Sequence, residues 1–408
     1  MVAGDKNIWF LSEVYYPDEQ GTAFYTTGIA EGLAGTYSVH VLCSSPTVTA
    51  RGSRVARKVT RNGVDIQRCK GTTLNKDILL LRLVNIFTFS ISTLFKALVN
   101  VKKGDIIVAV TSPPSSPYMA KIVSWCKGAT CILRLEDVYP EILVATGMIK
   151  SNGLIDTCFG LLNKYLFKSA DRIVVLGRDM KALAEKRIGS GGNHIRIIRS
   201  WADTDVVFPA PKAENVLLKE LGLTDKFVVS CVGNMGRAQD IEFIFEAISL
   251  LNADDTIHFL FIGSGSKRNW MESEIARRGL RNVTIVSQRP RSEQSCFLNA
   301  CDISMISLLL GVTGAGVPSR TYNLMAAGKP IIAVTREDSE VSLLVREENI
   351  GWVVPPVDAG CLVQAIIAAR SDSNKLRQMG VRAYASAKEK FSREKILDEY
   401  HDLIENLC

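Results

Sequence analysis

A glycine-rich segment that leads into a helix is the part of this sequence best suited to chemistry. The run GVTGAGVPSR contains, around a proline, the residues Gly311, Gly314, Gly316, Ser319 and Arg320. Glycines let a backbone approach a ligand closely, and proline suits the first turn of a helix. The amides at a helix start bind phosphate, and Ser319 and Arg320 would add to them. The segment predicts a pyrophosphate site, although a purely structural loop gives the same pattern.

A second cationic group lies near the middle of the chain. Arg237 stands in VGNMGRAQD, just beyond the strand-like run KFVVSCV. A guanidinium there can hold a diphosphate through two parallel hydrogen bonds and stabilise charge on a departing phosphate. A surface arginine paired with Asp240 is the alternative. Asn234 and Gln239, in the same segment, are weaker candidates for this site.

The first half of the chain carries two further candidate segments. Gly21 and Thr22 stand between a strand and a helix, so their backbone could face the same diphosphate unless the turn is structural. Asp137 and Glu141, in LRLEDVYPE, follow another strand and could bind the hydroxyls of an acceptor or orient its nucleophile. Two carboxylates also suggest a glycosidase, but that interpretation needs an apposed pair that spacing alone does not establish. We assign Asp137 as the catalytic candidate.

Alternating strands and helices must position these residues. Runs such as NIWFLS, IIVAVT and TCILRL alternate with helical patterns, and the rhythm restarts after SWADTDVVFPAPKAE. This alternation predicts an α/β fold of two Rossmann-like domains with parallel sheets. We place them at 1–203 and 204–385, followed by a C-terminal helix over 386–408 that packs back on the first domain. Ligands would bind in a cleft between the domains, at the carboxyl ends of the strands.

Composition limits the class of protein. The 408 residues fit two domains, and 47% hydrophobic with 22% charged residues is an ordinary globular composition. Ten scattered cysteines without a CxxC pair, and an N-terminus without signal-peptide features, favour the cytoplasm. No cluster of residues has metal-ligand spacing, so we expect no metal and no other cofactor.

A basic segment followed by an apolar helix suggests a partner. The net charge is +7, and one stretch whose only acid is Asp65 contains Arg51, Arg54, Arg57, Lys58, Arg61, Arg68, Lys70 and Lys76. The run 78–99 is long enough to span a membrane, but its polar members form one helical stripe: Arg82, Asn85, Thr88, Ser92 and Lys96. We therefore expect residues 51–99 to dock peripherally on the anionic inner face of the plasma membrane, with no nucleic acid as partner. A core helix with a solvated polar stripe is the alternative.

Four segments together resemble one enzyme family over almost the whole chain. PSRTYNLMAAGKP is similar to the donor-binding signature of retaining glycosyltransferases of GT-B architecture, family four, in the N-acetylfucosamine transferase branch of O-antigen and colanic-acid assembly. YYPDEQGTAFYTTGIAEGL resembles the first glycine loop of that family. LRLEDVYPEILVATGMI resembles its acceptor-side motif, and VGNMGRAQDIEFIFEAI the motif that opens its second domain.

The resemblance implies a metal-independent enzyme that moves a sugar, with retention, from a nucleotide sugar to a lipid-linked or polysaccharide acceptor. A UDP sugar is the expected donor, and lipopolysaccharide or capsule the expected kind of product. Arg237 would stabilise the leaving diphosphate. Other residues expected near the donor are Gly263, Ser264, Ser287, Gln288, Gly314, Ala315, Gly316, Val317, Ser319, Arg320 and Asn323.

The chain departs from that family at a pair of glutamates. The two positions, with seven residues between them, are here Ala315 and Asn323. Asn323 can still hydrogen-bond a ribose, while Ala315 offers a donor sugar only its backbone amide. A non-catalytic partner subunit that binds a nucleotide sugar without turnover is therefore an alternative. A non-hydrolysing epimerase shares the architecture, but we would expect carboxylates and a histidine in its site, and no histidine occupies the acceptor-side segment here.

Overall fold

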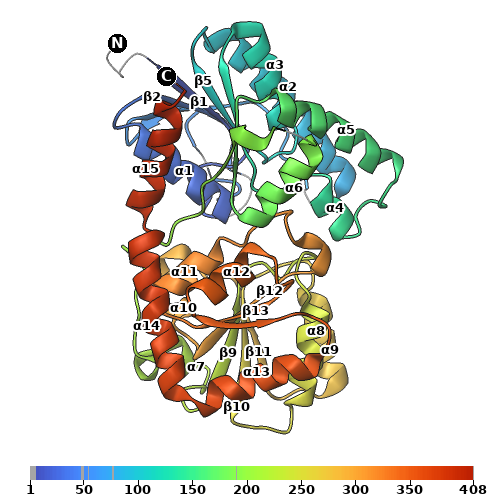
Figure 1. The fold of residues 1–408 in the computed structure, drawn as a ribbon, viewed down its shortest axis with the longest axis vertical. Helices are drawn as coiled ribbons and strands as arrows, with labels where there is room; N and C mark the ends of the chain where they lie inside the picture. The colour runs from blue at the N-terminus through green and yellow to red at the C-terminus, as the bar shows by residue number, and fades with distance from the viewer. Residues whose placement is uncertain (1–5, 47–49, 54, 76–77, 190, 408) are drawn as a thin grey trace. The chain divides into compact units, whose positions relative to one another are not determined.

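The chain folds as two α/β units, each built on its own sheet (Figure 1). The computed structural model describes residues 6–46, 50–53, 55–75, 78–189 and 191–407, so Arg54 and Lys76 of the basic segment lie outside the described residues. Unit 1 comprises Met1–Pro140, Asn152–Arg199 and Ile396–Cys408, and unit 2 comprises Glu141–Ser151 and Ser200–Lys395. The predicted α/β class with two parallel sheets is confirmed.

A single sheet forms the centre of unit 1. Its strand order is β3-β4-β2-β1-β5-β6-β7-β8, and only β3 and β4 pair antiparallel. The strands are β1 (Asn7–Leu11), β2 (Ser38–Cys43), β3 (Lys58–Arg61), β4 (Val64–Arg68), β5 (Ile106–Val110), β6 (Thr130–Arg134), β7 (Arg172–Val175) and β8 (Ile195–Ile197). β5 is buried along its whole length. Such a continuous apolar run is what a parallel sheet covered on both faces requires.

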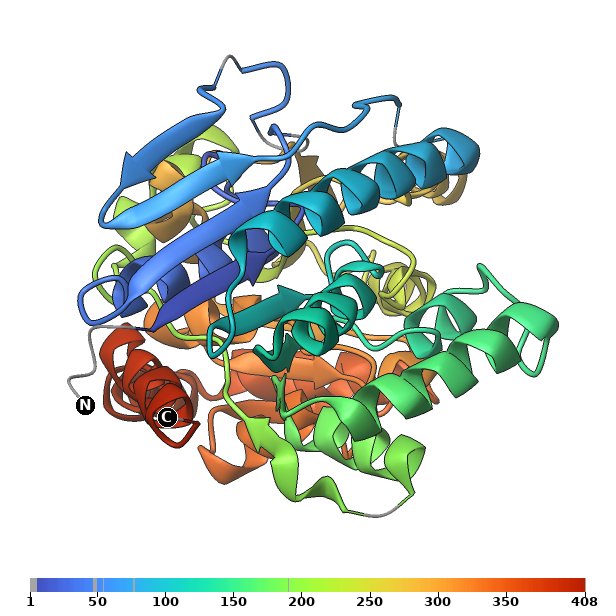
Figure 2. The same cartoon turned by 90° about the horizontal axis from the view of Figure 1, so that it is seen from above.

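Helices cover both faces of this sheet (Figure 2). They are α1 (Gly21–Leu33), α2 (Leu79–Asn100), α3 (Ser116–Lys127), α5 (Leu154–Ser169), α6 (Arg178–Ile188) and, from the C-terminus, α15 (Arg393–Glu405). Right-handed crossovers place α2, α3, α5 and α6 on one face, and α1 on the other. α15 packs beside α1, where the Leu397 side chain lies against Gly32. The His401 ring stacks on the Tyr37 ring, with 5.9 Å between the ring centroids.

Unit 2 has an all-parallel sheet in the order β11-β10-β9-β12-β13-β14. Its strands are β9 (Phe227–Val232), β10 (Ile257–Ile262), β11 (Val283–Val286), β12 (Ile303–Ser307), β13 (Ile331–Val334) and β14 (Gly351–Val354). Its helices are α4 (Glu141–Ala145), α7 (Val216–Glu220), α8 (Ile241–Leu250), α9 (Arg268–Arg278), α10 (Gln294–Leu298), α11 (Arg320–Ala326), α12 (Glu340–Glu347), α13 (Ala359–Ser371) and α14 (Ser373–Lys390).

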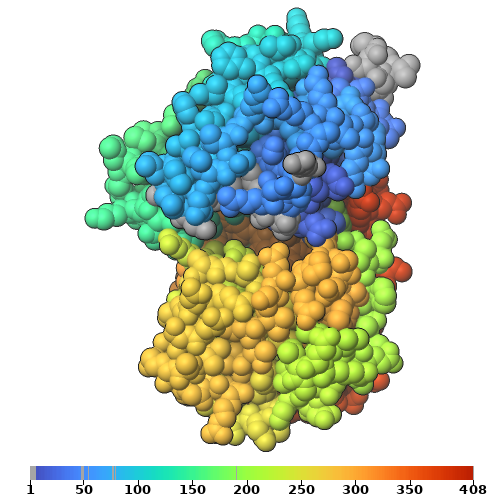
Figure 3. Space-filling view, turned by 180° about the vertical axis from the view of Figure 1, so that it is seen from behind, coloured from blue at the N-terminus to red at the C-terminus, as the bar shows by residue number. Residues whose placement is uncertain are grey.

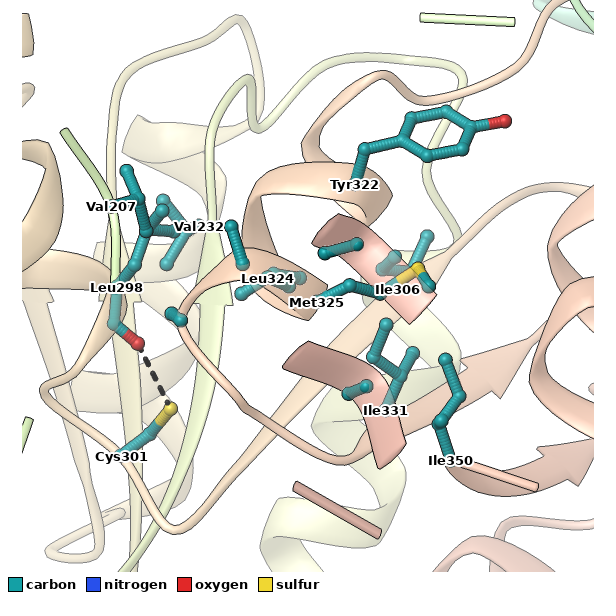
Figure 4. Close-up of a cluster of buried hydrophobic side chains, with 14 of the residues drawn as sticks. Val207, Val232, Leu298, Cys301, Ile306, Tyr322, Leu324, Met325, Ile331 and Ile350 are labelled. Carbon is teal, nitrogen blue, oxygen red and sulfur yellow. Dashed lines mark hydrogen bonds between the residues drawn. The ribbon is translucent and has the colours of Figure 1, made fainter. Parts of the chain in front are cut away.

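A buried cluster anchors α11 in unit 2 (Figure 4). Tyr322, Leu324 and Met325 of this helix are buried, and they pack in one cluster with Ile306 of β12 and Ile331 of β13. Burying each such side chain contributes about 1.5–3 kcal/mol. The core therefore holds α11 in place. The first residues of this helix, from Arg320, lie at the carboxyl ends of the unit 2 strands.

The basic segment contains a hairpin that we did not expect. β3 and β4 are joined at Asn62 and Gly63, whose φ angles are +46° and +80°. Arg51, Arg57, Lys58 and Lys70 are exposed, as an anionic partner would require. Arg68 departs from this expectation, because it is buried and donates hydrogen bonds to Ser44 O (3.0 Å) and Tyr16 O (2.8 Å).

Helix α2 turns most of its polar stripe inward, although Arg82 is exposed, so the alternative of a core helix with a solvated stripe is wrong. Asn85 is buried and exchanges hydrogen bonds with the backbone of Leu74 (2.9 and 3.0 Å), and Lys96 Nζ donates to Arg68 O at 2.8 Å. Phe87 and Phe95 on the apolar side are 65% and 66% exposed. By length and composition alone Leu80–Asn100 could cross a membrane. It connects β4 to β5 of one sheet, however, so its two ends lie on one folded unit.

Candidate functional site

The candidate residues of unit 2 follow strands that end at one edge of the sheet. Asn234 and Arg237 follow β9, Gly263 and Ser264 follow β10, and Ser287 and Gln288 follow β11. The glycine-rich segment follows β12, which pairs with β9. Because all six strands are parallel, their carboxyl ends meet at this edge, where open α/β sheets bind ligands.

The loops after β9 and β10 interlock closely. Gly233 N–H donates to Ile262 O at 2.8 Å, and Met235 N–H donates to Ser264 O at 2.7 Å. Gly263 has φ +152°, and a Cβ there would lie 1.9 Å from Gly233 O. Gly263 thus has a structural role, because no other residue fits this approach of two backbones.

Arg320 places a buried, unpaired guanidinium at the same edge. A Cβ on Gly233 would lie 3.0 Å from Arg320 Nη1, so the absent side chain at Gly233 leaves room for this group. Part of Arg320 stays accessible, but its Nε and Nη2 are buried without a hydrogen-bond partner in the described part of the chain. Burial lowers the pKa of Arg320, against the opposing effect of the Cys231 thiol. A buried cation without a partner is costly, so this group calls for an anion.

Arg237 is exposed in the turn after β9. The alternative, an ion pair with Asp240, is not present among the described residues. Asp240 instead caps α8, because its side chain accepts from Phe243 N–H at 3.4 Å. Burial raises the pKa of Asp240, and Lys267 is the cation that opposes this rise. Gln239 is buried, and its backbone carbonyl accepts from Lys267 Nζ at 3.0 Å. The Arg237 guanidinium is thus available to a ligand.

Three of the smaller candidates form a hydrogen-bonded rim. Ser264 Oγ donates to Gln288 Oε1 at 3.0 Å, and Arg268 Nη1 donates to Ser287 Oγ at 3.3 Å. The rim joins the loops after β10 and β11, so a ligand's base could meet side-chain hydroxyls as well as backbone.

The two positions that lack glutamate are held by internal hydrogen bonds. Ala315 is buried, and its N–H donates to Val312 O at 2.8 Å, so this amide is not available to a sugar as we expected. Asn323 is also buried, and its Oδ1 accepts from Asp203 N–H at 2.9 Å instead of facing a ribose. Both groups therefore stabilise unit 2 in this structure.

The remaining glycine-loop candidates lead into α11. Gly314 has φ +82°, a conformation that favours glycine, while Gly316, Val317 and Ser319 are half-buried. Ser319 precedes the helix without capping it through its side chain. Its hydroxyl is therefore not needed by the helix and could contact a phosphate.

Sequence reasoning missed two hydroxyls at this edge. Thr313, after β12, and Thr335, directly after β13, each have a buried Oγ1 without a hydrogen-bond partner among the described residues. For Thr335 the available signal was its place directly after an apolar strand, and for Thr313 it was its place within the glycine-rich segment. Both are further candidates for binding oxygen atoms of a ligand.

In unit 1, Gly21 and Thr22 form the start of α1. This helix has no side-chain cap and no acid in its first turn, which suits an anion. Arg68 holds the preceding loop through Tyr16 O, and the Arg61 guanidinium lies 4.0 Å from the centre of the Tyr16 ring. The basic segment thus helps to position this glycine loop.

Asp137 and Glu141 fall in different units. Asp137 follows β6 in unit 1, and its N–H donates to Thr111 Oγ1 at 3.3 Å. Burial raises the pKa of Asp137 to about 6. Glu141 begins α4 in unit 2, where a Cβ on Gly311 would lie 3.3 Å from Ala145 Cβ. α4 therefore packs against the start of the glycine-rich segment.

Replacing Asp137 with asparagine should separate stability from activity. The folded pKa of about 6 lies above the ordinary 3.8, so the folded state holds its proton longer and stability falls as pH rises between these values. Removing the buried charge should raise the free energy of unfolding by about 2–3 kcal/mol at pH ~8 and change it little at pH ~4. If the Asp137 carboxylate takes part in the reaction, the asparagine variant should lose its transferase activity. Urea unfolding at both pH values tests this, and an equal destabilisation at both would contradict it.

Among the described residues, no group of three His, Cys, Asp or Glu side chains is placed to hold a metal ion. At the edge of the unit 2 sheet, Lys267 and Arg268 pair with Glu242 and Glu272, whereas Arg237 and Arg320 pair with no carboxylate among the described residues. Two guanidinium groups can bind a diphosphate through charge-assisted hydrogen bonds.

Comparison with known proteins agrees with this chemistry. The family described as Glycosyl transferases group 1 matches residues 215–386. A probable glycosyltransferase, WbjE of Pseudomonas aeruginosa, is 32% identical over 317 residues, 76% of each chain. A putative colanic acid biosynthesis glycosyl transferase, WcaI of Escherichia coli strain K12, is 22% identical over 364 residues, 86% of this chain and 89% of its own.

A solved structure shows the same fold. Anabaena Alr3699/HepE in complex with UDP-glucose aligns with a TM-score of 0.74 over 98% of this chain and 99% of its own, at 14% identity. Two parallel-sheet α/β units of this kind form the GT-B architecture expected from the motifs.

Proposed function

The chain belongs to the group 1 glycosyl transferases, and on that premise we propose that it transfers a sugar, with retention, from a UDP sugar to a lipid-linked or polysaccharide acceptor. The observation that carries the proposal is the buried, unpaired Arg320 guanidinium at the carboxyl edge of the unit 2 sheet. A diphosphate supplies the anion that this group lacks. The relative bound to UDP-glucose and the relative named for colanic acid biosynthesis support the donor class and the kind of product.

The two arginines divide the work in this proposal. Arg320, buried beside Gly233, holds the diphosphate in the bound donor. Arg237, exposed after β9, meets the charge that grows on the β-phosphate oxygen as the glycosidic bond breaks. Together they neutralise the leaving nucleoside diphosphate without a metal. Asp137 orients the acceptor hydroxyl once its carboxyl is ionised, above about pH 6.

Membrane docking is the second part of the proposal. The exposed cations of residues 51–70 and the outward apolar side of α2 would hold unit 1 on an anionic inner leaflet. A lipid-linked acceptor presents its sugar at that surface. The enzyme would then be cytoplasmic and peripheral on the plasma membrane.

A non-catalytic nucleotide-sugar subunit is the second candidate. It is favoured by one observation, the engagement of Ala315 N–H and Asn323 Oδ1 in internal hydrogen bonds. A protein of this kind would bind a donor through Arg320 but would not need the exposed Arg237 at the leaving group.

A calorimetric titration with UDP-, GDP-, ADP- and dTDP-sugars tests the donor. We expect UDP sugars to bind at least about tenfold more tightly than the others, a difference of about 1.4 kcal/mol. Proton NMR of the product should then show the anomeric configuration of the donor. Binding of none of these nucleotides would contradict the assignment of the glycine-rich segment, and equal binding of all four would contradict the UDP assignment.

A further inference from the structure

The large apolar side chains that unit 1 exposes lie mainly on one layer of helices. Phe87 and Phe95 stand on α2, Trp125 on α3, and Leu154, Leu161 and Tyr165 on α5. In the described part of the chain α1, α6 and α15 expose no large hydrophobic side chain. The exposed set thus extends well beyond α2.

The helices that carry these side chains are neighbours. α3 packs against both α2 and α5, and right-handed crossovers put all three on the same face of the sheet. Figure 2 shows α2, α3 and α5 side by side, and Figure 3 shows the light-blue atoms of α2 and the green atoms of α5 reaching the surface on one side of unit 1. We call the exposed side of these three helices the α2/α5 face.

Helix α5, like α2, exposes large apolar residues and buries an asparagine. Its exposed apolar residues Leu154, Leu161 and Tyr165 recur at the spacing of one helical face, and exposed Cys158 lies between them. Its buried Asn163 accepts from Tyr118 Oη at 2.6 Å. Each of the two helices thus turns an asparagine inward and large apolar side chains outward, although Phe89 of α2 and Leu166 and Phe167 of α5 are buried. Single exposed apolar residues are ordinary, but a continuous surface of them marks an interaction site.

The charge of this face selects its partner. α2, α3 and α5 carry a single acid, Asp156, which accepts from Asn152 N–H at 2.8 Å. Against it stand the cations Arg82, Lys127, Lys164 and Lys168, while Lys96 and Lys121 of the same helices donate to Arg68 O (2.8 Å) and Ser169 O (2.5 Å). A second copy of the face would meet like charge, whereas an anionic lipid surface meets opposite charge around an apolar centre.

We infer that the whole α2/α5 face, and not residues 51–99 alone, inserts into an anionic membrane leaflet, with α5 supplying part of the inserted surface. The inference rests on the membrane docking in the proposed function and deepens it. α5 and Asp137 both belong to unit 1, so insertion of α5 would fix the acceptor side of unit 1 at the lipid surface. Lysine side chains at the rim can reach the headgroups while their stems stay among the lipids.

Vesicle partition of matched variants tests the inference. One variant carries Leu161→Ser, Leu162→Ser and Tyr165→Ser on α5, and a second carries Phe87→Ser and Phe95→Ser on α2. The control carries Val357→Ser and Val381→Ser, which are exposed residues of unit 2. With phosphatidylcholine vesicles containing about one third phosphatidylglycerol, each helix variant should partition at least about tenfold more weakly than the control. Thermal unfolding and UDP titration first establish that each variant keeps the wild-type fold.

A fluorescent label gives the position of α5 directly. A polarity-sensitive dye on Cys158 should shift to the blue when these vesicles are added, while the same dye on exposed Cys361 of α13 should not. Wild-type partition by the α5 variant, with loss in the α2 variant, would overturn the inference and leave residues 51–99 as the docking element. Wild-type partition by both variants would overturn docking through the α2/α5 face, and UDP titration would still decide the donor proposal. A shift of the Cys158 dye with protein concentration, without vesicles, would assign the face to a second copy and overturn the inference.

Discussion

Replacing Arg320 with leucine is expected to weaken UDP binding by at least about 100-fold while making the unliganded protein more stable. The loss of affinity follows from removing two or more charge-assisted hydrogen bonds, each contributing about 1.5–3 kcal/mol. The gain in stability follows because the buried Nε and Nη2 have no partner in the described residues, so leucine removes a desolvated charge. We expect a gain of about 1–2 kcal/mol.

Thermal unfolding with and without UDP measures both effects in one experiment. Wild type should gain stability with UDP, whereas the Arg320→Leu protein should start higher and gain nothing. Arg278→Leu is the matched control, because Arg278 lies on α9, pairs with Glu274 at 2.6 Å and donates to Phe245 O. That control should lose stability and keep its affinity for UDP. If Arg320→Leu instead destabilises the protein and still binds UDP, Arg320 is structural.

Replacing Arg237 with alanine is expected to lower kcat by about 10²–10³ while changing UDP affinity by less than about tenfold. Removing one preorganised donor to a developing oxyanion typically costs this much in rate. Arg237 is exposed and pairs with no carboxylate among the described residues, so its removal should leave stability within about 0.5 kcal/mol of wild type.

Steady-state rates and single-turnover rates separate the contributions of Arg237. Arg237→Lys keeps the charge but not the planar pair of donors, so its rate should fall between those of wild type and alanine. Arg281→Ala, an exposed arginine just before β11 at the other end of the strands, should behave like wild type. An equal loss of kcat and UDP affinity in Arg237→Ala would show that Arg237 acts on the bound donor and not on the transition state.

The positions of many site residues could be predicted from the sequence, because these residues directly follow the strands of a parallel sheet. Arg237, Ser264, Gln288 and the glycine-rich segment each follow a buried apolar run, and such runs must end at one edge. The start of α11 at Arg320 was equally accessible, since a proline precedes it and Gly328 follows it.

The internal bonds of the site could not be predicted, because they join distant parts of the chain. Asn323 Oδ1 accepts from Asp203 N–H, which lies 120 residues away in the sequence. Nothing near Asn323 indicates that partner. In the same way, the contact between Arg320 and Gly233 depends on the packing of α11 against the sheet.

For helix α2, the sequence did not show which side of the helix faces the protein. Its periodicity gave the polar stripe correctly, but an amphipathic pattern is the same whether the polar or the apolar side faces the protein. Only the hydrogen bonds of Asn85 and Lys96 to residues 68–74 decide the direction.

The β3–β4 hairpin, by contrast, had a local signal in the Asn62–Gly63 dipeptide, which the surrounding basic residues obscured.

Transferase activity is best tested by measuring UDP release from a UDP sugar by the purified protein, with and without a lipid extract of cell membranes as acceptor. We expect release that requires the extract, produces a sugar-bearing lipid or polysaccharide, and is lost in Arg237→Ala. Tight UDP-sugar binding without release from any extract would contradict the transferase and establish the non-catalytic subunit in its place.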